Sequence, residues 1–425
     1  MSRPASKFKI DLQTLDLYSD YLISSCGQVT ATGLSQVTDI SNDKVSRFLG
    51  GVKFDKAGDK FEKHGFTAKD LWFLVKSNVR GDECEEGGIT IDDSICEKEF
   101  TDENDLVCWH YDHSKGRNVK GVNLVNYIYQ GKTMSIPISF DLVTKTKIVQ
   151  KKDKNGNMKD FRCSEKSKNQ MVQDSIKIFV QNQIKFKYFF MDIWFGCSET
   201  LNLIAAYKKY YITPIKSNRK VALSKKDKSK KNWTKLEDIN FKDDQVQQVW
   251  IESMDHSVLL TKHVFTNKDD STANQYLITN NLSLLTDSKD TTNEKENKEN
   301  KENKENVKNI ITKLYHKRWK IEEYHKSMKS LLGLTKSPTK NQTTQSNHFF
   351  CTIYSYFKME LITKFTQLKT TTTTATKTIK TIKTIKNHFH LKSQIYIKAN
   401  QQAFKELQNL KSQIQKLKLL VSCER

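Results

Sequence analysis

Four side chains between residues 311 and 334 have types and a spacing that suit chemistry on phosphate. The segment, ITKLYHKRWKIEEYHKSMKSLLGL, contains no Gly or Pro before Gly333, so we expect a single helix. A carboxylate can hold a divalent metal, Arg and Lys can bind phosphate, and a phenol can hydrogen-bond phosphate or stack on a base. At about 100° per residue, one stripe roughly 60° wide carries these groups, namely Tyr315, Arg318, Glu322 and Lys329.

The alternative for this stripe is a solvated charged face with i,i+4 pairs, such as Arg318 with Glu322. Two further aspartates favour the chemical interpretation. In GGITIDDS, Ile89 and Ile91 alternate up to Asp92, and the short apolar strand KYFFMD ends in Asp192. Ligands and metals bind at strand ends in α/β sheets, so the pattern predicts a metal-dependent phosphoryl-transfer site on DNA.

The elements expected around these aspartates are those of a mixed α/β sheet. VNLVNYIYQ (Val122–Gln130) and MSIPISFDLV (Met134–Val143) are expected to form a hairpin around Gly131 and Lys132. The charged stretch KKDKNGNMKDFRCSEKSKN, residues 151–169, is expected to be a loop. MVQDSIKIFVQNQI has helical spacing, KYFFMD is a strand, LNLIAAYKK is helical and YYITPI is another strand. The order predicts helices packed on a sheet.

Residues 1 to about 80 are expected to be helical. The segments Ala31–Val37 and Asn42–Leu49 are expected to be two short helices around a turn at 39–42, with Ser41 as N-cap and Gly50 as terminator. Two short helices around a tight turn in a basic protein are typical of a helix-turn-helix DNA reader, and an ordinary helical hairpin is the alternative.

Residues 217–306 have the character of an insertion. VQQVWIES, SVLLTKHVFT and QYLITNN are strand-like, and four Lys-Glu-Asn repeats follow at 295–306. A second repetitive run, TTTTATKTIKTIKTIK, spans residues 371–386. Neither repeat can bury a core, so neither is assigned chemistry. The stretch from about Tyr396 onward is expected to be helical.

The chain has 425 residues and a net charge of +22, which predicts a polyanionic partner. DNA or RNA is the first candidate and an anionic membrane surface the second, while a Lys-biased genome would explain part of the excess. No apolar run is long enough for a membrane span, and no secretory signal begins the chain, so an intracellular location is expected.

The cysteines and histidines do not form a recognisable metal motif. Eight cysteines are scattered without a C-x-x-C pair, so a zinc finger is not expected and the thiols should be reduced and structural. In WHYDHSKG, His110 and His113 flank Asp112. A metal cluster is one interpretation of this group, and a surface turn leading into a strand is the preferred one.

The spacing Y-x2-R-x3-E-x6-K resembles the signature of a large group of bacterial insertion-sequence transposases. In this chain it is formed by Tyr315, Arg318, Glu322 and Lys329. ITIDDS resembles the first-Asp block of that group, and FFMDIWF resembles its second-Asp block, with an apolar strand, Asp and a Trp-aromatic pair. WHYDHSKGRNVKGVNLVN and PIKSNR also resemble family segments. The resemblance runs from about Gly87 to Gly333, interrupted by the Lys-Glu-Asn repeat.

The resemblance implies an RNase H-like mixed sheet with flanking helices, a helical N-terminal domain and a β-rich insertion before the Glu helix. It implies a catalytic, metal-binding triad of Asp92, Asp192 and Glu322, in which Asp93 competes for the first position; the spacing to Ser94 favours Asp92. The expected regions are a helical DNA-binding region (1–84), the first part of the catalytic domain (85–216), the insertion (217–306), the Glu helix (307–345) and a helical C-terminal region with a low-complexity segment (346–425).

The same resemblance implies cleavage at transposon ends followed by strand transfer. Two Mg²⁺ ions, for which Mn²⁺ could substitute, would activate a water and stabilise the departing 3′ oxygen, without a covalent enzyme intermediate. Tyr315, Arg318 and Lys329 would hold phosphates near the cleaved end. Trp319 and Trp194 would stack on an unpaired base or replace it, with core packing as the alternative.

Further DNA contacts are expected from Lys216 and Arg219, which follow a strand near the site, and from Lys326 on the Glu helix beside His325; ordinary surface charge is the alternative. The expected partners are the inverted-repeat ends and target DNA, with a homodimer assembled on DNA and no membrane. The expected location is the bacterial cytoplasm, at the nucleoid. The alternative functions are a catalytically inactive DNA-binding protein derived from a transposase, and a general RNase H-like nuclease.

Overall fold

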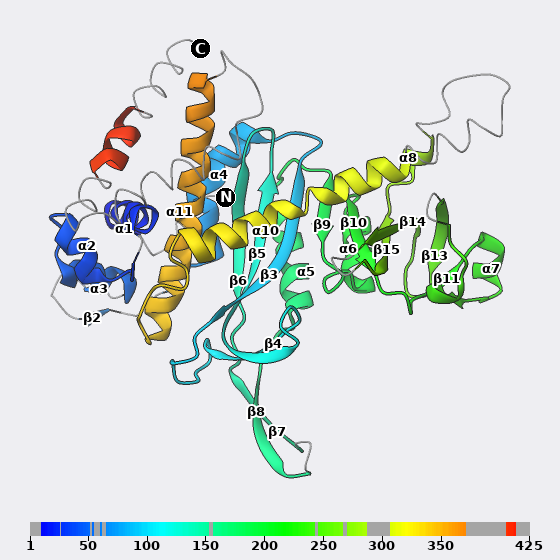
Figure 1. Cartoon of the computed structure of the whole chain (residues 1–425), viewed down its shortest axis with the longest axis horizontal. Helices are drawn as coiled ribbons and strands as arrows, with labels where there is room; N and C mark the ends of the chain where they lie inside the picture. The colour runs from blue at the N-terminus through cyan, green and yellow to red at the C-terminus, as the bar shows by residue number, and fades with distance from the viewer. Residues whose placement is uncertain are drawn as a thin grey trace, which may run out of the picture.

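A long mixed sheet organises the chain (Figure 1). The computed structural model describes residues 10–25, 27–51, 53–54, 60–61, 65–152, 156–242, 245–266, 270–286, 307–370 and 405–413. Both repetitive runs, 295–306 and 371–386, lie outside these residues. The strands of the sheet are β3 (Gly88–Glu97), β4 (Cys108–Asp112), β5 (Arg117–Gln130), β6 (Ser135–Leu142), β9 (Tyr188–Met191), β10 (Tyr210–Ile215), β11 (Lys220–Ala222), β12 (Thr234–Lys235), β13 (Val246–Ile251), β14 (Ser257–Thr266) and β15 (Thr272–Thr279).

The strand order is β12-β11-β13-β14-β15-β10-β9-β3-β5-β4, and β6 also pairs with β5. Its centre is parallel, because β9 runs parallel to both β3 and β10. The strands β5 and β6 form the expected antiparallel hairpin, with a register shift between Tyr127 and Ile128. This arrangement confirms the mixed α/β sheet with flanking helices, which is consistent with an RNase H-like fold.

Helices cover both faces of the sheet centre. On one face lie α5 (Lys168–Gln181) and α6 (Ser198–Ala206), where Phe179 of α5 packs edge-on against Tyr127 of β5 at 5.3 Å. On the other face, the helix of residues 307–316 buries Val307 and Ile311 against Tyr188 and Phe190 of β9. Alternation along each strand therefore sends successive side chains into two different cores.

The region before the Glu helix extends the same sheet. The strand β15 pairs antiparallel with β10, and β14 and β13 follow, so the expected strands of residues 217–306 continue the central sheet. The remaining elements of this region are α7 (Lys225–Ser229), the 3-10 helix η1 (Leu236–Asp238) and α8 (Ser283–Thr286).

The N-terminal region is helical, as expected, apart from two two-residue strands. The turn between α2 (Ala31–Val37) and α3 (Asn42–Leu49) ends at Ser41, whose side chain accepts a hydrogen bond from the Lys44 amide and caps α3. Both helix boundaries agree with those expected. The other elements here are α1 (Leu12–Ser24), β1 (Lys53–Phe54), β2 (Lys60–Phe61) and α4 (Ala68–Asp82).

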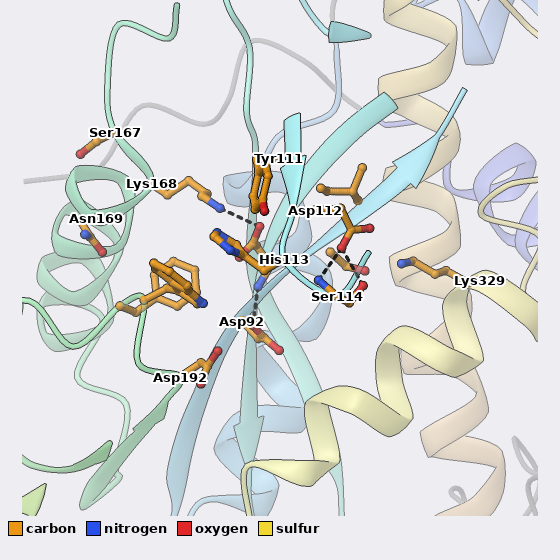
Figure 2. A pocket seen from close by; sticks show the side chains of 15 residues that line it. Asp92, Tyr111, Asp112, His113, Ser114, Ser167, Lys168, Asn169, Asp192 and Lys329 are labelled. Atoms are coloured by element: carbon orange, nitrogen blue, oxygen red, sulfur yellow. Dashed lines mark hydrogen bonds and ion pairs between the residues drawn. The ribbon is translucent and has the colours of Figure 1, made fainter. Parts of the chain in front are cut away.

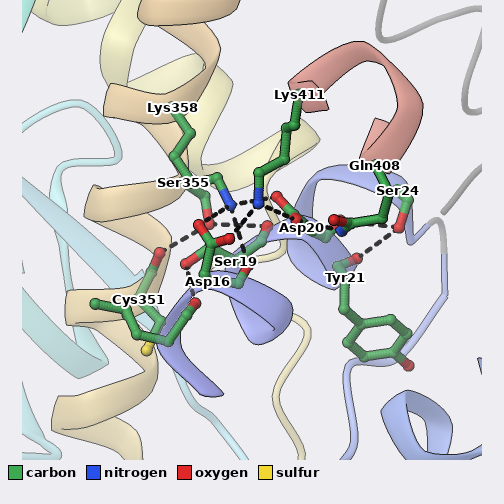
Figure 3. Close-up of polar contacts among 11 residues, drawn as sticks. Asp16, Ser19, Asp20, Tyr21, Ser24, Cys351, Ser355, Lys358, Gln408 and Lys411 are labelled. Atoms are coloured by element: carbon green, nitrogen blue, oxygen red, sulfur yellow. Dashed lines mark hydrogen bonds and ion pairs between the residues drawn. The ribbon is translucent and has the colours of Figure 1, made fainter. Parts of the chain in front are cut away.

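The long helix α11 (Gln342–Thr370) packs along α1, and the helix of residues 405–413 is hydrogen-bonded to α1. Figure 3 shows what joins them. Lys358 of α11 donates to Asp16 and Asp20 of α1, Lys411 binds the same two carboxylates, and Gln408 donates to Asp20 at 2.6 Å. Asp20 is fully buried. We call these five residues the helix-junction cluster.

Two expectations about local structure are wrong. The charged stretch 151–169 is not a loop, because β7 (Lys147–Lys152) and β8 (Met158–Cys163) pair into a hairpin and α5 begins at Lys168. The segment 311–334 is not one regular helix. A turn at residues 317–318 separates the helix of 307–316 from α10 (Trp319–Lys326), which passes into the π-helical segment η2 (Ser327–Leu331).

The described cysteines, Cys84, Cys96, Cys108, Cys163, Cys197 and Cys351, are free thiols, as expected. The group around Asp112 is the end of β4 and its turn into β5, as preferred from the sequence. No helix in the described part of the chain is long and apolar enough to cross a membrane.

Candidate active site

A cleft of about 710 Å³ lies where β9 ends beside β3 (Figure 2). Asp92 and Asp192 contribute carboxylates to its wall, and Lys329 of η2 reaches it from the opposite side. The rest of the lining comes from Asp93 and the two residues after it in β3, from Trp194 and Phe195 after β9, from the end of β4 and its turn into β5, and from the N-terminus of α5. Residues distant in sequence are therefore brought together at one edge of the parallel strands.

The register between β3 and β9 places the two aspartates side by side. The strands pair in parallel up to Ile91 opposite Met191, where β9 ends, and Asp92 and Asp192 are the next residues. Asp192 thus follows its strand directly, as the sequence predicts. Asp92 does not end its own strand, because β3 continues to Glu97 on its pairing with β5. Because β9 ends at Met191 while β3 continues, Asp92 has no paired strand on its β9 side.

Asp92 and Asp93 point to opposite faces of β3, as alternation requires. The Asp93 carboxylate binds the Lys168 ammonium of α5 at 2.9 Å. The Asp92 carboxylate lies 3.6 Å from the Arg318 guanidinium, on the face covered by the Glu helix. The two adjacent carboxylates therefore have different partners.

Arg318 connects the Glu helix to β3. At the turn where the helix is interrupted, its guanidinium lies 2.5 Å from Glu322, reaches Asp92 and sits 5.7 Å from the ring centroid of Tyr315. Only 13% of the Arg318 side chain is exposed, and its Nε has no hydrogen-bond partner. The guanidinium therefore faces the two carboxylates with one N–H unpaired inside the protein.

Negative charge is crowded around Asp92. Burial, together with Asp93 and Asp192, raises the pKa of Asp92 to about 7, although Arg318 acts in the opposite direction. Burial opposes the charge of Arg318, but Tyr315, Asp92 and Glu322 outweigh it and raise the pKa of the guanidinium. Arg318 alone therefore does not neutralise the carboxylates at this edge.

The donor set suits a hard divalent cation. Mg²⁺ prefers carboxylate oxygens, and Asp92 and Asp192 present theirs together at the cleft. Among the described residues, no group of three His, Cys, Asp or Glu side chains could hold an ion. Two of the three expected ligands, Asp92 and Asp192, line the cleft, whereas Glu322 is paired with Arg318 and does not line it.

An aromatic group forms one wall of the cleft. The His113 ring stacks on Trp194 at 4.0 Å, and Lys216 Nζ lies 4.5 Å from the Trp194 ring centroid. Trp194 keeps 44% of its surface exposed, so core packing is excluded for it. Lys216 and Arg219 line a second cavity of about 570 Å³, which shares Trp194 with the cleft.

The remaining predicted contacts are distributed around the Glu helix. Trp319 is 57% exposed, so it too is outside the core, and its ring lies edge-on to His316 with the centroids 5.9 Å apart. Lys326 is exposed but does not line the cleft. Tyr315 is buried in the core against β9 rather than exposed to a crevice, so the expected shared face is incomplete.

His325 is half-buried and lies 3.1 Å from the Asn126 amide of β5, and Tyr324 donates to the same Asn126 at 3.0 Å. Burial lowers the pKa of His325 to about 3, so the imidazole is neutral. These contacts hold the helix against β5.

Sequence reasoning missed Lys168 and the ring partner of Trp194. Lys168 lies at the start of α5, which the charged stretch concealed, and its binding to Asp93 depends on the sheet face. The sequence predicts that His113 lies in a surface turn, with a metal cluster as the alternative. Its position beside an Asp and a Gly-containing turn could have indicated a loop at the site, but not its stacking on Trp194.

Comparison with known families identifies the class of this fold and cleft. A family model described as DDE superfamily endonuclease matches residues 14–236, more than half of the chain, and one described as transposase DDE domain matches residues 158–357. The first match contains Asp92 and Asp192, and the second contains Asp192 and Glu322. The chain therefore belongs to the DDE superfamily endonucleases.

Its architecture and both matches are those of a transposase-type nuclease, a class that generally uses divalent metal ions and acts on DNA. A comparison with curated proteins finds no match to this chain.

Proposed function

We propose that this protein is an insertion-sequence transposase that cleaves DNA at transposon ends and joins them to target DNA. The observation that carries the proposal is the junction of Asp92 and Asp192 at the end of β9, linked through Arg318 to Glu322. It fits the Y-x2-R-x3-E-x6-K spacing, whose Arg and Glu are the residues joined there. The match to transposase DDE domains supports the same function.

Asp92, Asp192 and Glu322 would hold the metal ions, two Mg²⁺ in the proposed form, with Mn²⁺ as a substitute. Bound divalent ions would supply positive charge for the attacking and departing oxygens of the phosphodiester. Asp92 is preferred to Asp93 because it faces Arg318 and the Glu helix, whereas Asp93 faces Lys168. Glu322 would exchange its pairing with Arg318 for metal binding, which leaves the guanidinium to hold a DNA phosphate.

The DNA would be held by groups around the cleft. Lys329 reaches into the cleft and would bind a phosphate near the cut. Lys216 and Arg219 line the adjoining cavity and would hold a neighbouring phosphate. Trp194 and Trp319 are exposed, so they could meet an unpaired base, although His113 already stacks on Trp194. Lys326, which is exposed outside the cleft, would bind a phosphate further along the duplex.

The N-terminal helices would read the transposon end. The helix α3 buries Val45 and Leu49 and exposes Ser46 and Arg47 between them, as a recognition helix does. Two protomers would bind the two ends of the element, so the active assembly would be a homodimer on DNA at the nucleoid. The region boundaries at 84, 216, 306 and 345 belong to the same proposal.

The decisive test uses the full-length protein, the inverted repeats that flank its gene, and Mg²⁺. We expect nicking at the repeat ends and joining of the freed 3′ ends to a target duplex. Glu322→Ala should bind the ends but leave them intact. Light scattering with and without the ends measures whether a dimer assembles.

The alternatives predict different products in that assay. Binding by the wild-type protein without nicking would identify a DNA-binding protein that has lost catalysis. Nicking of any duplex, irrespective of the repeat sequence, would identify a general nuclease. Either outcome overturns the proposed function.

A further inference from the structure

The hairpin of β7 and β8 projects from the body beyond the sheet (Figure 1). We call its two strands, Lys147–Lys152 and Met158–Cys163, the β7–β8 arm. The strands form a separate two-stranded sheet, and every residue of β7 is exposed. At about 3.3 Å per residue, six paired residues reach roughly 20 Å. A ribbon of this length that covers no core of its own has a surface available to a partner.

The arm is basic and carries a small apolar centre. Residues 147–163 contain six Lys or Arg and two Asp. Directly paired residues share a face of the hairpin. On one face, Val149 and Phe161 form a pair. This pair lies between the pair that contains Lys147 and the pair that contains Lys151. Both members of this apolar pair are exposed. The face therefore alternates between positive charge and a narrow apolar strip.

Ion pairs fix the arm to the body at its base. Arg162 of β8 binds Asp105 at 2.6 Å and lies 3.6 Å from Glu103. Just before β7, the Lys145 ammonium donates to the Trp109 carbonyl of β4 at 2.5 Å. The direction of the arm is consequently tied to the body by acidic partners at its base.

The base of the arm adjoins the cleft. The strand β4 leads into the turn residues Tyr111–Ser114, which line the cleft, and β8 leads within a few residues to Ser167 and Lys168, which also line it. The arm thus begins at the mouth of the candidate active site and points away from it. A long ligand that leaves the cleft on this side would run along the arm.

We propose that the β7–β8 arm binds duplex DNA that continues beyond the cleft. A two-stranded ribbon fits the major groove, Lys side chains neutralise phosphates, and small apolar contacts suit thymine methyl groups. An arm of roughly 20 Å would span about six base pairs at 3.4 Å per pair. The location rests on the proposed function, because it assumes that DNA occupies the cleft.

DNA is favoured over a second copy of the chain by charge. The protein carries a net charge of +22, so another copy would meet the basic arm with a surface that is also positive on average. The apolar strip formed by Val149 and Phe161 is also small beside the area that a stable dimer interface buries.

The test compares two full-length triple variants. One carries Lys147→Gln, Lys151→Gln and Lys152→Gln in the arm; the control carries Lys69→Gln, Lys76→Gln and Lys132→Gln, exposed lysines in and beside α4, away from the arm. Binding to a duplex of about 40 base pairs is measured by fluorescence anisotropy over a salt series, and Mg²⁺-dependent nicking of the same duplex is measured separately.

We expect the arm variant to lower the salt slope of log K by about two to three and to weaken binding about tenfold or more near physiological salt. The control should retain the wild-type slope. Equal slopes for the two variants would overturn the inference. So would an arm variant that binds DNA normally but loses self-association in light scattering, because the arm would then contact a second copy.

A measurement on the wild-type protein covers the case in which the arm variant folds poorly. Lysine acetylation followed by mass spectrometry should show Lys147 and Lys151 protected by the duplex and Lys69 labelled equally with and without it. Equal labelling at all three positions would overturn the inference. Wild-type protein that binds through the arm but never nicks would reject the proposed function and leave the arm proposal standing.

Discussion

The candidate active site and the helix-junction cluster both bury charged side chains, but they balance that charge differently. In the helix-junction cluster, Lys358 and Lys411 each contact both Asp16 and Asp20, so two cations face two carboxylates (Figure 3). At the cleft, one guanidinium lies against both Asp92 and Glu322, Lys168 pairs with Asp93, and Asp192 adds further negative charge nearby.

The difference separates a structural role from a functional one. A balanced buried cluster joins elements and needs no further ligand. An unbalanced one raises the pKa of its most buried carboxyl and is stabilised by added cations, which is what a metal-binding site requires. Burial of charge alone therefore does not identify a site, whereas uncompensated charge beside a cleft does.

The largest expected effect is on catalysis. Asp192→Asn should reduce Mg²⁺-dependent nicking by about three orders of magnitude, because loss of a metal ligand removes several kcal/mol of transition-state stabilisation. Duplex binding should persist. The matched control Asp238→Asn, an exposed acid in η1, should nick normally. Full nicking activity in Asp192→Asn would show that this cleft is not the site of catalysis.

The corresponding change in the helix-junction cluster should affect stability instead. Lys358→Met leaves Asp16 and Asp20 with fewer cations, and loss of one partner from a buried pair costs about 3–5 kcal/mol. Urea unfolding measures this loss. The double variant Lys358→Met with Asp20→Asn should recover part of it, because charge and partner are removed together. A variant as stable as wild type would show that the cluster is not structural.

Asp93→Asn tests the comparison within the cleft. Its side chain binds Lys168 on the opposite face of β3 from Arg318, so nicking should stay within about tenfold of wild type. The lost ion pair, which is partly exposed, should contribute about 1 kcal/mol or less. A loss as deep as that of Asp192→Asn would transfer the first ligand position from Asp92 to Asp93.

The smallest effect concerns pH. Burial pushes the pKa of Asp16 upward, but Lys358 and Lys411 outweigh it, and the pKa lies below its ordinary value of 3.8. The resulting stabilisation is complete above 3.8 and is lost as the pH falls through the lower folded-state pKa. The difference in unfolding free energy between wild type and Asp16→Asn should therefore be larger at about pH 6 than at about pH 3. A difference that grows on acidification would contradict the sign.

Local patterns in the sequence determined many individual elements and the residues that carry chemistry. The bounds of α2 and α3 follow from the Ser41 cap and the glycine at position 50, and the position of Asp192 follows from the four apolar residues before it. These signals are short-range, because capping, turn formation and alternation act over a few residues. The identities of the candidate carboxylates therefore follow from the order of the residues along the chain.

Only the tertiary structure decided which groups share an environment. The pairing of β3 with β9 and β5 sent Asp92 toward Arg318 and Asp93 toward Lys168. The β7–β8 arm was hidden because exposed strands need not alternate polar and apolar residues, and Lys358 meets Asp20 across 338 positions of sequence. Sheet register and charge compensation are set by long-range packing, so no local pattern could reveal them.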